Sequence, residues 1–203
     1  VSFQKQSANA AITSGNNTYQ FDGATFDVFE SASGAHVGTV QMDSNGRAQA
    51  TLLPNTAYYL VETTAPAGYI PLHDRIAFTT TNNGGYVTID EQPGTITLRI
   101  VKLDAATNAG PQVGASLAGA EFVCVSQSTP GWTQTLRTDE SGRATLTDVP
   151  LGTFTIYESK APEGYLPSGD SWSYTVGADQ LGDSGVVEIE SRVSDIPIAF
   201  DLE

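Results

Sequence analysis

The sequence predicts an all-β protein built of two β-sandwich domains in tandem, and three observations lead to this fold class. The chain has 203 residues, 39 % of them hydrophobic, which is enough to build one or two domains with cores. It contains 20 Gly and 10 Pro, and no window of eleven or more residues carries a convincing helical apolar period. Short strands joined by turns are therefore expected. The third observation is an internal repeat.

The two halves of the chain are one sequence written twice. YYLVETTAPAGYIP at 58–71 returns as FTIYESKAPEGYLP at 154–167, and an offset of 96 positions (158 minus 62) aligns the halves without a gap over a long stretch. Tandem duplication explains this best. A repeat of about 100 residues with frequent turn signals has the size of one small sandwich and is too long for a solenoid unit.

The domain boundary is expected at Pro93-Gly94, because this pair breaks a strand and the alternating run TITLRIVKL follows it. The first domain then covers 1–94 and the second covers 95–203. The linker is only a few residues long, which favours an elongated arrangement of the two domains.

Each half also carries a strong turn signal. MDSNGRAQA at 42–50 and TDESGRATL at 138–146 each place a polar turn ending in glycine between alternating segments. Asx and Ser residues followed by glycine are typical of tight turns between paired strands. Both segments are therefore predicted to be β-hairpins.

Charge and cysteine content exclude several classes of partner. The net charge is −14, from 23 acidic and 9 basic residues, and no basic cluster is present, so nucleic acid is not expected as a partner. Cys124 is the only cysteine, so no disulfide can form within the chain, and no Cys/His zinc pattern occurs. We expect no cofactor and no metal. No run of 18 apolar residues occurs, so membrane insertion of this stretch is not expected.

In the second half, three charged residues lie in phase with apolar rows. Side chains alternate between the two faces of a strand, so such residues point toward the core. Lys102, Glu158 and Asp195 each continue a row, and the rows are, in that order, Ile96-Leu98-Ile100, Phe154-Ile156 and Val187-Ile189-Ser191-Val193. The second domain is therefore predicted to bury a lysine and two carboxyl groups.

The first half repeats two of these features. Lys5 is in phase with Phe3, and Glu62 is in phase with Leu60. An unpaired charge in a core costs several kcal/mol, and a paired one does not always break even against hydrophobic residues. The charged sets therefore point to chemistry. The alternative is a buried ion pair, or a lysine whose amine reaches water at the end of its strand.

The residues K…GAxF…ExxAPxGY resemble the Cna B-type (SpaA-like) domains of Gram-positive surface proteins and pilins, which have an immunoglobulin-like fold. The resemblance covers nearly the whole chain, twice, and its most specific part is the glutamate motif. The matching segments are Lys5, GATF (23–26) and ETTAPAGY (62–69), then Lys102, GAEF (119–122) and ESKAPEGY (158–165).

This resemblance implies a spontaneous isopeptide bond within each domain. It joins a lysine of the first strand to an Asn or Asp of the last strand, and the motif glutamate assists. Neither terminal strand contains the more usual asparagine, so aspartate is expected as the acceptor. The expected catalytic residues are Glu62 and Glu158, and the expected crosslinks are Lys5–Asp90 and Lys102–Asp195.

The acceptor of the first domain is the less certain assignment by strand phase. Asp90 is in phase with Tyr86 and Thr88, whereas Glu91 follows Val87 and Ile89. Two alternatives remain open at this point. A β-bulge re-aims Asp90 toward the core, or the first domain has lost its acceptor.

The expected reaction follows from burial. A core environment lowers the pKa of an amine and raises that of a carboxyl group, so a neutral amine can attack as a nucleophile. The glutamate passes protons, the sandwich holds the groups close together, and water leaves when aspartate is the acceptor. The product crosslinks the first strand of the domain to the last.

The function expected from this reading is a structural stalk or shaft module of a surface adhesin or pilin, secreted and anchored to the cell wall of a Gram-positive bacterium. Its partners are other domains of the same surface protein or pilus subunits. Apart from one self-crosslinking turnover in each domain, we expect no enzyme activity. The closing segment IPIAFDLE is predicted to begin a further strand.

A competing interpretation is an adhesive module that binds a host glycan or matrix protein. Trp132 and Trp172 are its candidate stacking residues, although packing at the core or rim accounts for them better. A hydrolase has little support, because His36 and His73 lie in turn-like or edge contexts and no GxSxG or HExxH motif occurs.

Overall fold

The computed structural model describes residues 1–182 and 184–198, and this part of the chain forms two compact units. Unit 1 comprises Val1–Thr13, Asn17–Gly94 and Gly177–Gly185, and unit 2 comprises the remainder. The longest segments of the units meet between Gly94 and Thr95, where the sequence predicts its boundary. Because two short segments belong to the other unit, the domain limits 1–94 and 95–203 remain a prediction. The predicted strand in IPIAFDLE lies largely outside the described residues.

Unit 1 consists of two β-sheets. One sheet has the strand order β4-β1-β7 and the other has the order β3-β2-β5-β6. A four-residue helix, α1 (Ala10–Thr13), follows the first strand. The strands are β1 (Ser2–Ser7), β2 (Thr25–Glu30), β3 (His36–Gln41), β4 (Arg47–Gln49), β5 (Ala57–Thr64), β6 (Ile76–Thr79) and β7 (Tyr86–Glu91).

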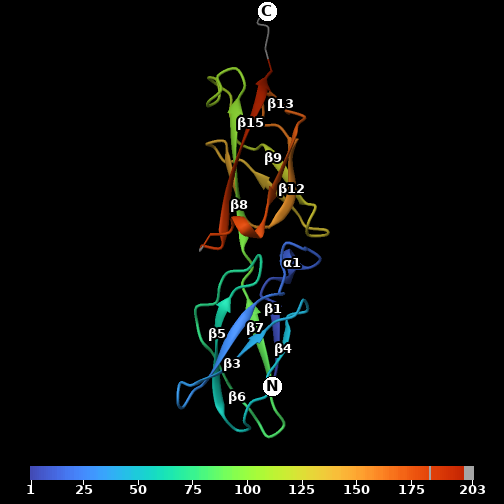
Figure 1. Ribbon diagram of the computed structural model, residues 1–203. Helices are drawn as coiled ribbons and strands as arrows, with labels where there is room; N and C mark the ends of the chain where they lie inside the picture. The colour runs from blue at the N-terminus through green and yellow to red at the C-terminus, as the bar shows by residue number, and fades with distance from the viewer. Residues whose placement is uncertain (183, 199–203) are drawn as a thin grey trace, which may run out of the picture. The chain divides into compact units, whose positions relative to one another are not determined.

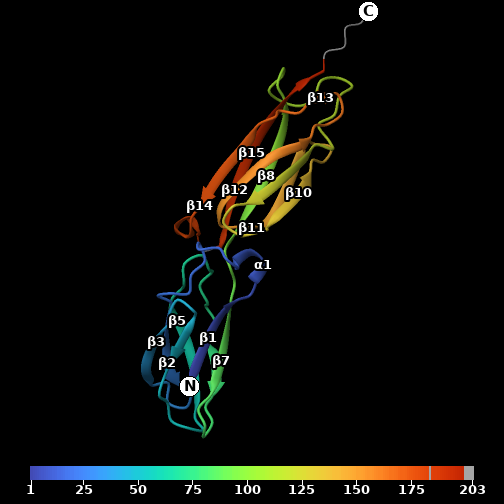
Figure 2. The ribbon, with the colours of Figure 1, turned by 90° about the vertical axis from the view of Figure 1, so that its right-hand side faces the viewer.

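Unit 2 repeats this plan with strand orders β11-β8-β15-β13 and β10-β9-β12-β14, which Figure 2 shows from the side. A short 3-10 helix (Ala178–Gln180) follows β14. The strands are β8 (Thr95–Asp104), β9 (Glu121–Ser126), β10 (Thr133–Arg137), β11 (Arg143–Pro150), β12 (Gly152–Lys160), β13 (Tyr165–Leu166), β14 (Ser171–Val176) and β15 (Val186–Pro197). The predicted fold class is confirmed: the chain is nearly all-β and forms two tandem prealbumin-like or immunoglobulin-like domains.

In each unit the first and last strands are parallel neighbours. β1 pairs with β7, and β8 pairs with β15, with no shift of register along either ladder. Parallel strands cannot be joined by a tight turn, so the chain between them builds the rest of the domain. A bond between these two strands therefore closes nearly the whole domain into a loop.

Buried and exposed side chains alternate along the strands, and the buried ones form the two cores. On β15, residues 191, 193 and 195 are buried while 190, 192, 194 and 196 are exposed. The same period governs β9 and most of β8, where Val101 is buried as well, as expected for strands with one face on a core. Buried residues of the unit 1 core include Phe3, Phe26, Val28, Met42, Tyr58, Leu60 and Ile89, and those of unit 2 include Ile96, Leu98, Ile100, Phe122, Phe154, Ile156 and Val193.

The prediction of two β-hairpins is correct for the turns but wrong for the pairing of the strands. The turns form as expected. Asp43 Oδ1 accepts the backbone N–H groups of Asn45 and Arg47 at 2.8 Å each. Asp139 Oδ1 accepts those of residues 141 and 143 at 2.8 and 3.0 Å. The flanking strands do not pair with each other, because β3 and β4 lie in different sheets, as do β10 and β11. Each turn therefore carries the chain from one sheet to the other.

Among the described residues, no helix combines the length and the apolar character that a membrane span requires.

Candidate functional site: two buried lysine–carboxyl clusters

The second unit buries a lysine between two carboxyl groups. Lys102 Nζ lies 2.7 Å from Glu158 Oε1 and forms a second, very short ion pair with Asp195 Oδ1. All three side chains are completely buried. The structure therefore brings together the three residues that strand phase predicts for this domain.

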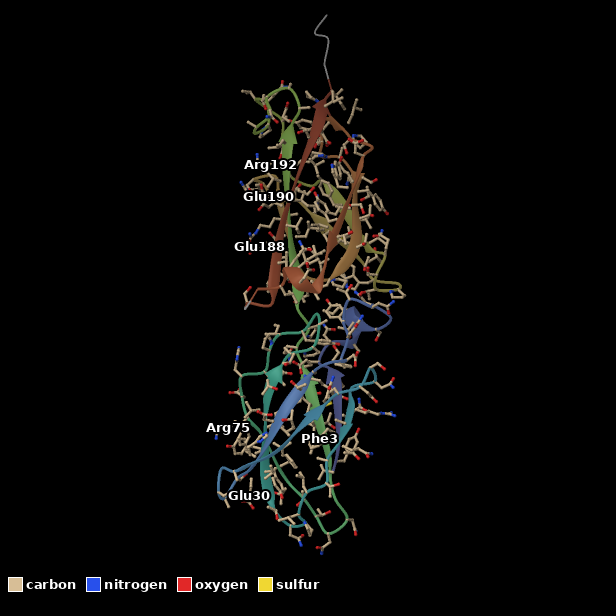
Figure 3. All side chains as sticks on the ribbon, viewed as in Figure 1. Phe3, Glu30, Arg75, Glu188, Glu190 and Arg192 are labelled. Carbon is tan, nitrogen blue, oxygen red and sulfur yellow. The ribbon has the colours of Figure 1, made fainter. Side chains whose placement is uncertain are left out.

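These three side chains come from three strands in two sheets. Lys102 lies on β8 and Asp195 on the adjacent parallel strand β15, whereas Glu158 comes from β12 of the facing sheet. The lysine and its aspartate are thus held by backbone pairing, and the glutamate reaches them across the core. Unlike the buried Asp195, the charged residues Glu188, Glu190 and Arg192 of β15 lie on the outer side of the sheet (Figure 3).

The glutamate motif has a direct structural purpose. Ser168, which follows the APEGYLP segment, donates its backbone N–H to Glu158 Oε2 at 3.1 Å. In unit 1, Leu72 donates its N–H to Glu62 Oε2 at 2.7 Å. In both units the donor lies ten positions after the glutamate. The Ala-Pro and Gly-Tyr residues between them therefore turn the chain back so that one carboxylate oxygen is held while the other faces the lysine.

Unit 1 contains the corresponding cluster. Lys5 Nζ forms a very short ion pair with Glu62 Oε1 and lies 2.8 Å from Glu91 Oε2. The side chains of Lys5 and Glu91 are completely buried, and that of Glu62 is 3 % exposed. The carboxyl group that β7 brings to the lysine is that of a glutamate.

The expectation that Asp90 faces Lys5 is wrong. Asp90 is exposed and accepts a hydrogen bond at 2.7 Å from Gln6 Nε2, on the outer side of β1. The β1–β7 ladder runs without a bulge from Ser2 opposite Tyr86 to Ser7 opposite Glu91, so nothing re-aims Asp90. Strand phase already indicated Glu91, which follows Val87 and Ile89, but the resemblance favoured an aspartate.

Phenylalanine of the GAxF motif lies beside each amine. The ring centroid of Phe26 is 4.5 Å from Lys5 Nζ, and that of Phe122 is 5.4 Å from Lys102 Nζ. Both rings are completely buried. An aromatic face attracts a cation and, at the same time, keeps water from the amine. Sequence reasoning used this motif for recognition only and did not foresee the contact.

The acceptor carboxyl groups are poorly solvated. Both side-chain oxygens of Glu91 and of Asp195 lack a hydrogen-bond partner in the described part of the chain, apart from their ion pairs. Burial raises the pKa of Glu91 to about 7, against the opposing effect of Lys5. Burial likewise raises the pKa of Asp195 to about 6, with Lys102 opposing. A protonated, electrophilic carboxyl group is therefore accessible near neutral pH in both units.

A further buried pair adjoins the second cluster and was missed from sequence. Tyr165 of the Gly-Tyr pair donates its hydroxyl to Asp104 Oδ2 at 2.9 Å, and both residues are buried. Burial acts to raise the pKa of Asp104, but hydrogen bonds from Tyr165 and from two backbone N–H groups outweigh it, and the pKa lies below its usual value. Asp104 is in phase with Lys102 at the end of β8, and this was the available signal.

The two tryptophans do not form one surface. Trp132 immediately precedes β10, and Trp172 lies on β14. These strands are the opposite edges of a four-stranded sheet, and both side chains are half-buried. The two candidate stacking residues therefore lie at opposite edges of the same sheet.

In the described ranges, 1–182 and 184–198, no group of three or more His, Cys, Asp or Glu side chains is arranged to hold a metal ion.

The family model for SpaA, described as a prealbumin-like fold domain, matches the chain twice, at residues 9–93 and 97–191. The chain belongs to this family.

Solved structures share the fold of this SpaA-type pair. The Bacillus anthracis TIE protein matches with a TM-score of 0.67 and 22 % identity, over 97 % of this chain and 33 % of its own. The pilus adhesin SpaC from Lactobacillus rhamnosus GG matches with a TM-score of 0.54 and 19 % identity, over 97 % and 31 %. A C-terminal fragment of SpaC matches at 0.50 and 17 %, over 98 % of each chain.

The SpaA-type chain therefore spans about a third of the length of the TIE protein. No curated protein sequence matches it significantly.

Proposed function

We propose that this chain is a structural stalk or shaft module of a surface adhesin or pilin, stiffened by isopeptide bonds that each domain forms by itself. The observation that carries the proposal is the same in both units. A lysine amine of the first strand lies, fully buried, against a carboxyl group of the last strand, with a glutamate of the facing sheet beside it.

The reaction in the second domain needs no external reagent. The Glu158 carboxylate accepts a proton from the Lys102 ammonium, and the resulting amine attacks Cγ of the protonated Asp195 carboxyl. An N–C bond forms, a C–O bond breaks, and the amine's second proton leaves with the hydroxyl group as water. Glu158 ends as a neutral acid beside a neutral amide. Two buried charges are removed, which is a large gain in an apolar core.

The fold also promotes the reaction by holding the reacting groups in place. Parallel pairing of β8 with β15 fixes the lysine and the aspartate, and the backbone N–H of Ser168 fixes Glu158. Groups held in reacting geometry avoid the entropy cost of meeting. The reaction occurs once per domain, so the module is a self-modifying structural protein and not a turnover enzyme.

The mechanical consequence suits a stalk. A tensile load on a sandwich separates its terminal strands before it extends the rest of the domain. A covalent bond between those strands removes this route. The partners we propose are other domains of the same surface protein or pilus subunits, and the location is the cell wall of a Gram-positive bacterium.

Peptide mapping tests the crosslink of the second domain. Trypsin cleaves after Arg99, Arg137 and Arg192 but not after an acylated lysine. A digest of the crosslinked protein should therefore contain 100–137 joined to 193–203, lighter than the sum of the two peptides by one water. Cleavage after Lys102 together with a free 193–203 peptide would contradict the proposal.

A further inference from the structure

We infer that the first domain closes its crosslink through a glutamate, by an amide between Lys5 Nζ and Cδ of Glu91. This rests on the reaction proposed above and assigns its acceptor in the first domain. The two domains of one chain then use different acceptors, glutamate in the first and aspartate in the second.

Register identifies Glu91 as the counterpart of Asp195. In the β1–β7 ladder Lys5 lies opposite Ile89, and Glu91 is two residues further along β7. In the β8–β15 ladder Lys102 lies opposite Val193, and Asp195 is again two residues further along. Side chains two residues apart on a strand lie on the same face. Each carboxyl group therefore has the same position relative to its lysine.

Contacts and burial single out Glu91 in the same way. Its Oε2 lies 2.8 Å from Lys5 Nζ, and neither residue exposes its side chain. Apart from this ion pair, both of its oxygens lack a hydrogen-bond partner among the described residues. Asp90, the alternative carboxyl group on β7, is exposed and bound to Gln6 on the other face.

The neighbouring residue leaves room for the longer side chain. Glu91 lies opposite Ser7 on β1, whereas Asp195 lies opposite Asp104 on β8. Where the acceptor gains a methylene group, its cross-strand neighbour is a short serine, and where the acceptor is short, its neighbour is the longer aspartate. Close packing makes such paired changes of length meaningful, so Ser7 is part of what sets the acceptor.

The chemical balance is that of the second domain. The Glu62 carboxylate accepts a proton from the Lys5 ammonium, the amine attacks Cδ of protonated Glu91, and the hydroxyl group leaves as water with the amine's second proton. One N–C bond replaces one C–O bond. The raised pKa of Glu91, about 7, makes the required carboxylic acid available at neutral pH.

The substitution Glu91→Gln tests this acceptor, because an amide acceptor releases ammonia where an acid releases water. Crosslinking through residue 91 then yields the same covalent product from both chains. The denatured Glu91→Gln protein should therefore have the same intact mass as the denatured wild type. The matched control Asp90→Asn should keep its own calculated difference from the wild type and still lose water.

A second readout uses the wild-type chain alone and does not depend on a variant folding. Its tryptic digest should contain 1–47 joined to 76–99, and fragmentation of this species should place the bond on Glu91. A joined species with the bond on Asp90 overturns the inference. So does a wild-type chain in which 100–137 is joined to 193–203 but trypsin cleaves after Lys5 and 76–99 is free, because the proposed function then holds and only the glutamate acceptor fails. Absence of both joined species means that the proposed reaction itself fails.

Discussion

At the scale of single residues, the charged groups inside these two cores are the feature that needs explanation. Removing one partner of a buried ion pair costs about 3–5 kcal/mol, and apolar residues in the same space are often at least as stable. Lys102, Glu158 and Asp195 are nonetheless fully enclosed, with Phe122 beside the amine. Formation of an amide converts this unfavourable arrangement into a neutral one, which is why we interpret the clusters as reactive and not as simple ion pairs.

The first prediction concerns the proton-transferring glutamate. Glu158→Ala should abolish the crosslink of the second domain, since Asp195, the other carboxyl group beside Lys102, must itself be protonated to react, and the first domain should still react. The intact mass of the Glu158→Ala chain should exceed, by one water, the mass calculated for the same chain with both crosslinks. Glu163→Ala, which removes an exposed carboxylate of the same motif, is the control and should leave both crosslinks unchanged.

The second prediction follows from the raised pKa values. A carboxyl group whose pKa is raised is a neutral acid below that pKa and a carboxylate above it, and the reaction uses the acid. When the chain is diluted from denaturant into buffers of different pH, crosslinking of the second domain should slow as the pH rises through about 6. The first domain should slow as the pH rises through about 7. Quenched samples analysed by tryptic mapping report each rate separately, and a rate that does not fall with rising pH would contradict the assignment for that domain.

The third prediction concerns the buried tyrosine. Tyr165→Phe removes the hydroxyl that Asp104 Oδ2 accepts at 2.9 Å and leaves a buried carboxylate short of a partner. This should lower the free energy of unfolding by about 1–3 kcal/mol. Denaturant unfolding measures it, with Tyr157→Phe, a substitution at a side chain that is 41 % exposed, as the control. A loss of the same size in both variants would remove the special role of the Asp104 pair.

At the scale of secondary structure, parallel pairing of the first and last strands fixes the reacting groups. A glycine allows the neighbouring turn to pack closely against the first of these strands. Gly46 has φ +72°, and its carbonyl accepts the backbone N–H of Lys5 at 2.7 Å. A Cβ at this position would lie 2.6 Å from the carbonyl oxygen of Lys5. The turn between β3 and β4 therefore packs directly against the residue that carries the amine.

The fourth prediction compares two glycines with nearly the same backbone conformation. Gly46→Ala should destabilise the first domain and reduce its crosslinking, because the new methyl group pushes against β1. Gly34 has φ +70° and open space around it, so Gly34→Ala should cost only about 1 kcal/mol of backbone strain and leave the crosslink intact. Thermal unfolding and the yield of the joined peptides 1–47 and 76–99 distinguish the two variants. Equal stability and equal crosslinking of the two variants would show that the contact between Gly46 and Lys5 is unimportant.

The sequence predicts the strands and most of the site because both depend on local alternation. The phase of Lys102, Glu158 and Asp195 with their apolar neighbours places all three inside, and the repeat supplies the domain count. Phase also indicated Glu91. The prediction of Asp90 is wrong because the resemblance implies an Asn or Asp acceptor, whereas the alternation along β7 turns Glu91 toward the core and Asp90 away from it.

Other features were not predictable because they depend on contacts between distant segments. The Asp43 and Asp139 turns are encoded locally, but which sheet the next strand joins is decided by packing across the sandwich. Likewise, the N–H groups that hold Glu62 and Glu158 lie ten residues further on and reach the carboxylates only through the path of the loop. No sequence period reports such contacts.

At the scale of the whole molecule, each crosslink would close nearly all of its domain into a covalent loop. The bond from Lys5 to Glu91 joins residues 86 positions apart (91 minus 5), and that from Lys102 to Asp195 joins residues 93 positions apart (195 minus 102). Load applied to the chain ends would then pass through the two amides and would not reach these loops. A stalk built of such domains would therefore not lengthen by unfolding.

The fifth prediction is mechanical. Pulled from its ends in a single-molecule experiment, the wild-type chain should show no unfolding step before it detaches. A Glu62→Ala, Glu158→Ala double variant should show two steps, each releasing roughly 300 Å of chain at full extension. Two such steps in the wild type would mean that neither domain is closed by a bond.

The central claim is that both domains crosslink themselves with loss of water, and the intact mass of the denatured wild-type protein tests it most directly. The account predicts a mass lower than that calculated from the sequence by two waters, one for Lys5–Glu91 and one for Lys102–Asp195. A mass equal to the calculated value would contradict it, and the two clusters would then be buried ion pairs in a stalk without a covalent lock.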